Sequence, residues 1–124
     1  MNRARLAELV LVVDGLGCAA AAVALGCRRD LAEAVGAGPG ARWAAVAALG
    51  ATAAGLLHPG VTGPARPDLT RAAVINIGWV AVCSYAAYRR LTHPGRALLL
   101  ATAGADGLAA MAQWALRTSV SPVS

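Results

Sequence analysis

The 124-residue chain is 58% hydrophobic and only 14% charged, whereas about a quarter of the residues in a soluble domain are charged. This composition excludes an ordinary water-soluble domain and predicts a protein whose solvent is the lipid bilayer. The net charge is +5, and all 11 basic residues other than histidine are arginines, because the chain has no lysine. These arginines stand singly or in pairs at the ends of apolar runs, as membrane-surface anchors do, so we expect no nucleic-acid binding.

Four apolar runs follow one another along the chain. They cover about residues 6–27, 43–58, 71–89 and 96–117. A helix needs about 20 residues to cross the hydrocarbon core; the first and fourth runs have that length, and the two middle runs are shorter. We predict an all-α fold, a polytopic membrane protein in which residues 1–124 form one bundle of four transmembrane helices.

The connecting segments carry turn residues. After the first run, Asp30 followed by Glu33 resembles a capping box and predicts a short interfacial helix that begins at Asp30 and ends at Gly-Pro-Gly. Residues 58–68, with three prolines, predict an irregular surface loop, and residues 92–95 predict a tight turn. On this interpretation the two histidines, at positions 58 and 93, lie in loops.

The arginines do not define an orientation. With a cytoplasmic N-terminus, five arginines lie on the inner side and six on the outer side, although the positive-inside rule usually gives a clear bias. Either the chain inserts in both directions, or the arginine pairs bind anionic headgroups. Aromatic residues near the ends of the runs are expected to be interface anchors: Trp43, Tyr85, Tyr88 and Trp114.

Two aspartates lie near the centres of the first and last runs. Asp14 stands in LVVDGLG and Asp106 in AGADGLA. A carboxylate at the centre of a bilayer costs about 2.5–3.5 kcal/mol on insertion scales, so such residues are usually paired, protonated or turned toward the interior. We expect both to face the inside of the bundle, and we expect at least one of them to hold a proton.

Helical spacing places further polar groups beside these aspartates. Asn76, Trp79 and Cys83 share one face of the third run, Gln113 follows Asp106 by two turns, and Cys18 follows Asp14 by one turn. The candidate catalytic residues are Asp14, Asp106 and Asn76, and the candidate substrate-binding residues are Trp79, Gln113, Cys18 and Cys83. The cysteines lack paired metal-ligand spacing, so we expect neither a metal site nor a cofactor. An alternative is a hydrogen-bond network that only holds the helices together.

Three features together are similar to a family of small four-span integral membrane proteins, mostly uncharacterised, that are frequent in GC-rich bacteria. These features are Asp14 in the middle of the first run, the Asn-x-x-Trp of residues 76–79, and a fourth run that ends in the Gln-containing AQWALR. The resemblance implies a location in the bacterial inner membrane. Asp106 departs from the family pattern. In its chemistry the chain also resembles, by analogy alone, membrane-embedded cyclases that open isoprenoid or polyketide epoxides.

Two aspartates that are expected inside a membrane bundle favour an enzyme as the function of the chain. One aspartate would donate a proton to an epoxide, ketone or alkene of a lipophilic substrate that enters from the bilayer, and the other would accept one. Asn76 would orient the acid, and the ring of Trp79 would stabilise a carbocation. The alternatives are a small proton-coupled transporter or channel that works as a homodimer, and a non-catalytic subunit that packs on a partner through small residues such as Gly50 and Ala54.

Overall fold

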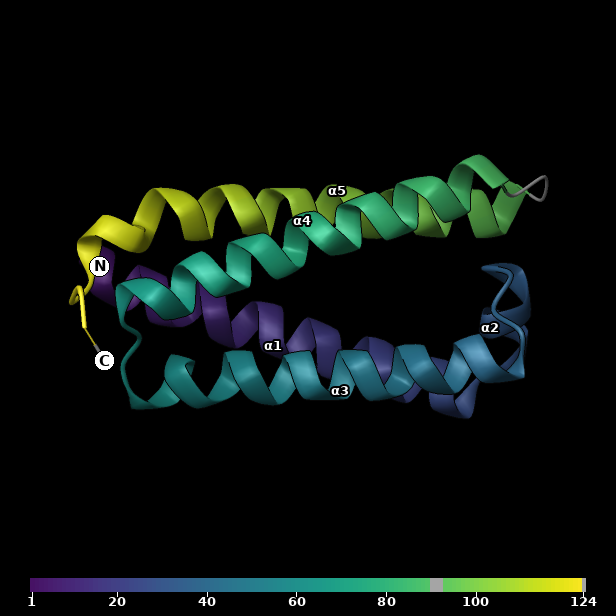
Figure 1. Ribbon diagram of the computed structural model, residues 1–124, viewed down its shortest axis with the longest axis horizontal. Coiled ribbons are helices and arrows are strands. Elements are labelled where there is room, and N and C mark those ends of the chain that lie inside the picture. The colour runs from purple at the N-terminus through teal and green to yellow at the C-terminus, as the bar shows by residue number, and fades with distance from the viewer. Residues whose placement is uncertain (90–92, 124) are drawn as a thin grey trace.

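The computed structural model describes residues 1–89 and 93–123, and its regular elements in that part of the chain are all helices (Figure 1). They are α1 (Arg3–Cys27), α2 (Arg29–Ala34), α3 (Pro39–Thr62), α4 (Arg66–Arg89), α5 (His93–Leu116) and the 3-10 helix η1 (Arg117–Ser119). The only strand-like pairing in these residues is an isolated bridge between Ala65 and Ser121. The prediction of an all-α fold is confirmed.

The four long helices form two pairs. α1 packs mainly against α3, and α4 packs mainly against α5 (Figure 1). The pairs meet where α1 crosses α5 and α4, at the end of the molecule that also holds both termini. There the backbone N–H of Arg66 donates to the carbonyl oxygen of Ser121 at 2.7 Å, which ties the C-terminal segment to the start of α4. The crossing of α1 over α4 and α5 is the part of the fold that brings polar side chains together.

Three helices, α1, α3 and α4, are long and apolar enough to cross a membrane, by length and composition. Many large apolar side chains point outward, among them Val13, Ile77 and Leu108, which are more than half exposed. An apolar surface of this extent is expected in lipid rather than in water. α5 has 24 residues, as many as α3 and α4, but Asp106 and Gln113 interrupt its apolar sequence.

The structure corrects the expected end of the second run. The prediction that residues 58–68 form a loop is wrong for most of that segment, because α3 continues through His58 and Pro59 to Thr62 and α4 already begins at Arg66. A proline inside a helix removes one backbone hydrogen bond, so a sequence pattern favours a break there. In the fold, this last turn packs against α1 through Gly60, and Gly63, with φ at 102°, ends the helix. Packing between the helices outweighs the local preference of the proline.

The short helix after α1 exists, but its cap differs from the prediction. α2 begins at Arg29, and Asp30 lies in its first turn instead of capping it. The carboxylates of Asp30 and Glu33 pair instead with Arg28 at 2.6 Å and with Arg29 at 2.9 Å. The hydrogen bond from the Arg28 guanidinium lowers the pKa of Asp30 to about 2. The adjacent arginines are therefore the side-chain partners of both carboxylates.

The second predicted turn, residues 92–95, falls partly outside the described residues, since residues 90–92 are not among them. His93 is the first residue of α5 and not a loop residue.

Arg42, at the start of α3, reaches the end of α1: its guanidinium donates to the carbonyl oxygens of Leu25 at 2.6 Å and Gly26 at 2.8 Å. These carbonyls have no partner within their own helix, so Arg42 satisfies them and fixes the α1–α3 pair at this end.

Two glycines allow α1 and α3 to approach closely. A Cβ atom on Gly60 would lie 2.9 Å from Cγ2 and 3.3 Å from the backbone nitrogen of Val12. A Cβ atom on Gly15 would lie 2.8 Å from Cγ of Leu57. By contrast, a Cβ atom on Gly50 would meet nothing within 4 Å, so the close packing within the chain uses Gly15 and Gly60.

Candidate functional site

A hydrogen-bonded cluster joins three helices at the crossing of the two pairs. The carboxylate oxygen Oδ2 of Asp14, on α1, accepts from Nδ2 of Asn76 on α4 at 2.6 Å and from Nε2 of Gln113 on α5 at 2.5 Å. Nδ2 of Asn76 also donates to Oε1 of Gln113 at 3.0 Å. Asn76 and Gln113 are the only buried polar residues among those described, with exposures of 1% and 0%. The bundle therefore places its buried polar groups at one point.

Helical periodicity explains why these side chains meet. On α1, the buried residues Leu11, Gly15 and Cys18 follow the three-to-four-residue spacing of one helix face, and Asp14 lies at the edge of that face. On α4 and α5, Asn76 and Gln113 lie within the buried faces themselves, among alanines that leave room for longer polar side chains. Each helix thus turns one polar side chain toward the crossing point.

One acceptor in the cluster has no donor. An amide NH₂ carries two hydrogens, and Asn76 uses both, one toward Asp14 and one toward Gln113. Its carbonyl oxygen Oδ1 is fully buried and accepts no hydrogen bond from the residues that the structure describes. Leaving a buried acceptor unsatisfied costs about 1–3 kcal/mol. Oδ1 of Asn76 could therefore accept a hydrogen bond from one more donor.

The second aspartate lies beside the cluster but outside its hydrogen bonds. Asp106 is half-buried on α5, and none of the hydrogen bonds found in the described chain involves its side chain. It is near enough to Asp14 for the two carboxylates to interact electrostatically. Cys18 lies within electrostatic range of both carboxylates, and Cys83 lies within that range of Asp106. Both thiols therefore lie in the same region. The arrangement pairs a fixed hydrogen-bond acceptor, Asp14, with a carboxyl group that has no fixed partner.

The remaining candidate residues lie around this region. Cys18 and Cys83 are buried with free thiols, and Trp79 is half-buried on α4, three residues after Asn76. Gln113, expected to bind substrate directly, instead donates to Asp14 and accepts from Asn76. The sequence spacing of seven residues linked Gln113 to Asp106, but it did not show which aspartate Gln113 contacts across the helix interface.

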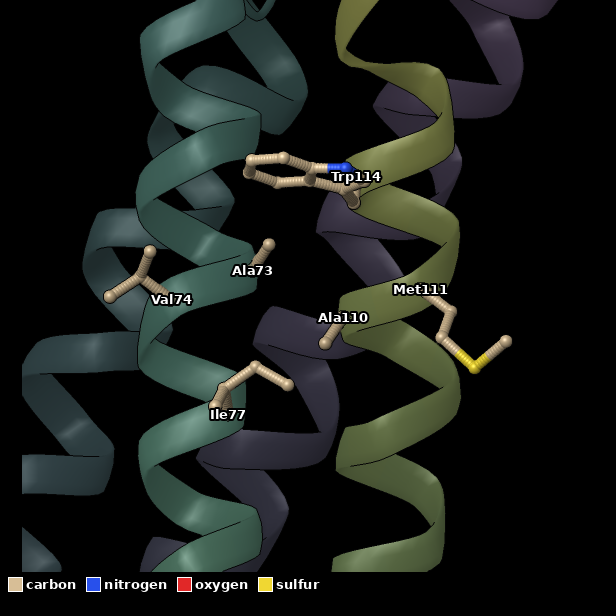
Figure 2. Close-up of a pocket in the computed structure, with 6 residues that line it drawn as sticks. All are labelled: Ala73, Val74, Ile77, Ala110, Met111 and Trp114. Carbon is tan, nitrogen blue, oxygen red and sulfur yellow. The ribbon is translucent and has the colours of Figure 1, made fainter.

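Two hollows lie near the cluster without opening onto it. The first, of about 330 Å³, is a groove between α4 and α5 (Figure 2) and the second, of about 280 Å³, lies between α3 and α4. The second has Asp68, Arg71 and Thr52 in its wall. No residue of the Asp14 cluster lines either hollow. Asp14 and Asp106 are both half-buried, and neither lines one of these hollows.

Sequence reasoning missed the groove between α4 and α5. It is lined by Ala73, Val74, Ile77, Ala110, Met111 and Trp114. Beyond it, the guanidinium of Arg117 stacks on the ring of Trp114, 3.6 Å from the ring centroid, and donates to the carbonyl oxygen of Trp114 at 2.7 Å. The three-residue spacing of Trp114 and Arg117 was the available signal for this stacking. The spacing within one helix cannot show that a second helix leaves a groove beside it.

Comparisons with known proteins do not extend these observations. No family model matches the chain, and no curated protein or solved structure is significantly similar to it. The class that the fold defines is an all-α protein with three helices able to cross a membrane.

Proposed function

We propose that the chain is a four-span enzyme of the bacterial inner membrane that performs acid–base chemistry on a lipophilic substrate. The reaction class is the opening, cyclisation or isomerisation of an epoxide or polyene of isoprenoid or polyketide type. In this proposal α5 crosses the bilayer with the other three long helices, and Asp106 and Gln113 face the inside of the bundle. The fourth span carries polar residues because the chemistry requires them there.

The observation that supports this proposal best is the unsatisfied oxygen of Asn76, a residue that is hydrogen-bonded to the carboxylate of Asp14. A network that only holds helices together gains most when every buried group has a partner. Here a buried acceptor has none, and Asp106 lies near Asp14 without a fixed hydrogen bond. A substrate hydroxyl or the acid proton of Asp106 would supply the missing donor at Oδ1 of Asn76.

The two carboxyl groups have different surroundings, which favours different roles. Oδ2 of Asp14 accepts hydrogen bonds from two amide N–H groups, which hold this carboxyl group in place and suit the role of proton acceptor. Asp106, which has no fixed donor, suits the acid. It would protonate the epoxide oxygen or an alkene carbon, and Asp14 would later receive a proton from the cationic intermediate. The substrate then loses as many protons as it gains, so the product is an isomer of the substrate, and return of the proton from Asp14 to Asp106 restores the starting state.

The apolar surroundings fit this chemistry. Cys18 and Cys83 are weakly polar and buried, so they exclude water from the region without competing strongly for the proton. Trp79 is the nearest aromatic residue in sequence to Asn76, and its ring is the candidate for stabilising positive charge on carbon. In this proposal the substrate would approach Asp106, whose side chain makes none of the hydrogen bonds found in the described chain, whereas Asp14 already accepts from Asn76 and Gln113.

The test is product formation by the purified protein in lipid vesicles, supplied with an isoprenoid epoxide or an isoprenoid polyene and followed by mass spectrometry for an isomeric product. Asn76→Ala should reduce the rate by less than the roughly 10²–10⁴-fold typical of a general acid or base, because Asn76 orients Asp14 rather than transferring a proton. Glu33→Gln, on exposed α2, is the control and should leave the rate unchanged. If Asn76→Ala matches the parent chain in rate, the proposed role of Asn76 is wrong.

A further inference from the structure

The groove between α4 and α5 is apolar along its length. All six residues that line it have nonpolar side chains, apart from the indole N–H of Trp114. Figure 2 shows Ala73 and Ala110 facing each other across the groove, with α1 behind them and Trp114 extending from α5 toward α4 at one end. The two alanines are buried, and their short side chains form the floor of the groove. The larger side chains at its rim are half exposed or more: Val74, Ile77, Met111 and Trp114. Such a groove suits a flexible hydrocarbon chain.

Beyond Trp114, at the end of the molecule that holds both termini, an arginine follows the groove on each side. Arg117, the first residue of η1, follows Ala110 by seven residues, and Arg66 precedes Ala73 by seven residues on α4, so each lies close to the line of the groove at this end. Two acidic residues lie at this end: Asp68 lines the other hollow, between α3 and α4, and Glu8 is on α1. Neither is among the six residues that line the groove, whereas an arginine follows the groove on each side.

The length of this feature fits one leaflet of a bilayer. Ile77 and Arg66 are eleven residues apart, which corresponds to about 16 Å along a helix. Half of a hydrocarbon core of roughly 30 Å is about 15 Å. A chain that lies in the groove would therefore run from the bilayer centre to the level of the arginines, where the headgroup of its lipid lies.

We propose that this groove binds one acyl chain of an anionic phospholipid, with the lipid phosphate held by Arg117 and Arg66. The guanidinium of Arg117 uses Nη1 for the carbonyl of Trp114, which leaves its other N–H groups to donate to phosphate. Stacking on the Trp114 ring holds the guanidinium in place before the lipid binds. This inference requires α4 and α5 to lie in the bilayer, but it does not depend on the acid–base chemistry. Each of the two proposals can therefore be wrong while the other holds.

The test uses the fluorescence of Trp114 in vesicles that contain phospholipids with brominated chains, which quench tryptophan on contact. Trp43→Phe and Trp79→Phe leave Trp114 as the single tryptophan. We expect brominated phosphatidylglycerol to bind beside Trp114 at least about fivefold more strongly than brominated phosphatidylcholine, since each arginine near an anionic lipid contributes roughly a fivefold preference. Arg66→Gln together with Arg117→Gln should abolish that preference.

A matched pair of arginines at the other end of the same two helices provides the control. Arg89→Gln together with Arg96→Gln removes the same charge from α4 and α5 far from the groove, and should leave the preference of Trp114 for phosphatidylglycerol intact. Equal quenching by both lipids in the parent chain would overturn the proposal, as would a preference that survives loss of Arg66 and Arg117. Absence of quenching by either lipid would also overturn it, because lipid chains would then not reach Trp114 at the end of the groove.

Discussion

Asp106→Asn is expected to abolish turnover while the protein remains folded, and Asp14→Asn is expected to do the same. An amide has nearly the shape of a carboxylic acid but has no transferable proton, so each change should lower the rate by about 10²–10⁴-fold. At position 14 the amide oxygen can still accept from Asn76 and Gln113, so the cluster should persist. At position 106 no hydrogen bond of the described chain is lost. The measurements are product formation in vesicles and thermal unfolding of the purified variants.

A purely structural role of the cluster predicts a different result for the two amide variants. If the cluster serves only to hold the helices together, both amide variants should behave like the parent chain or unfold at a higher temperature, since burying an amide costs less than burying a carboxylate. Full activity in both variants would assign the polar residues to architecture. Loss of folding in both variants would lead to the same conclusion, because the carboxylates would then be needed for stability.

Gly60→Ala is expected to lower the unfolding temperature clearly, through the contact between α1 and α3. The added methyl group would lie 2.9 Å from Cγ2 of Val12 and 3.3 Å from its backbone nitrogen. Backbone cannot rotate away as a side chain can, so the two helices must separate. Overpacking of this kind costs about 1–3 kcal/mol, more than the roughly 1 kcal/mol that alanine gains over glycine within a helix.

Gly50→Ala on the same helix is the matched control for this prediction. The added methyl group meets no atom within 4 Å there, so the intrinsic preference of alanine for helix should leave the unfolding temperature unchanged or raise it. Circular dichroism during heating in detergent measures both variants. Equal shifts in the two variants would show that α1 and α3 do not pack at Gly60 as described.

The helices could be predicted from the sequence because their signals are local. Apolar runs bounded by arginines gave four long helices, and the spacing of Asn76 and Cys83 correctly placed both on the buried face of α4. The end of α3 could not be predicted in the same way. The segment that begins at His58 looks like a loop when only its neighbours in sequence are considered, and it is helical because Gly60 packs on α1, which is distant in sequence.

The composition of the cluster was predictable, but its connections were not. Periodicity identified Asp14, Asn76, Gln113 and Asp106 as residues that share the inside of the bundle. Which of them touch depends on the angle at which α1 crosses α4 and α5, and no residue pattern within one helix encodes that angle. The two aspartates are related in sequence, in LVVDGLG and AGADGLA, yet only Asp14 receives amide donors. Their different roles in the proposal follow from this tertiary difference.

The central claim is that Asp106 holds a transferable proton within the bilayer beside a fixed acceptor, Asp14. A hydrophobic carbodiimide reacts with protonated carboxyl groups that it can reach from lipid, so it tests this claim without knowledge of the substrate. We predict that dicyclohexylcarbodiimide at neutral pH labels Asp106 and not Asp14, as located by peptide mass spectrometry, and that Asp106→Asn removes the label. Labelling confined to carboxyl groups outside the helix crossing, such as Asp30 or Glu33, would contradict the claim.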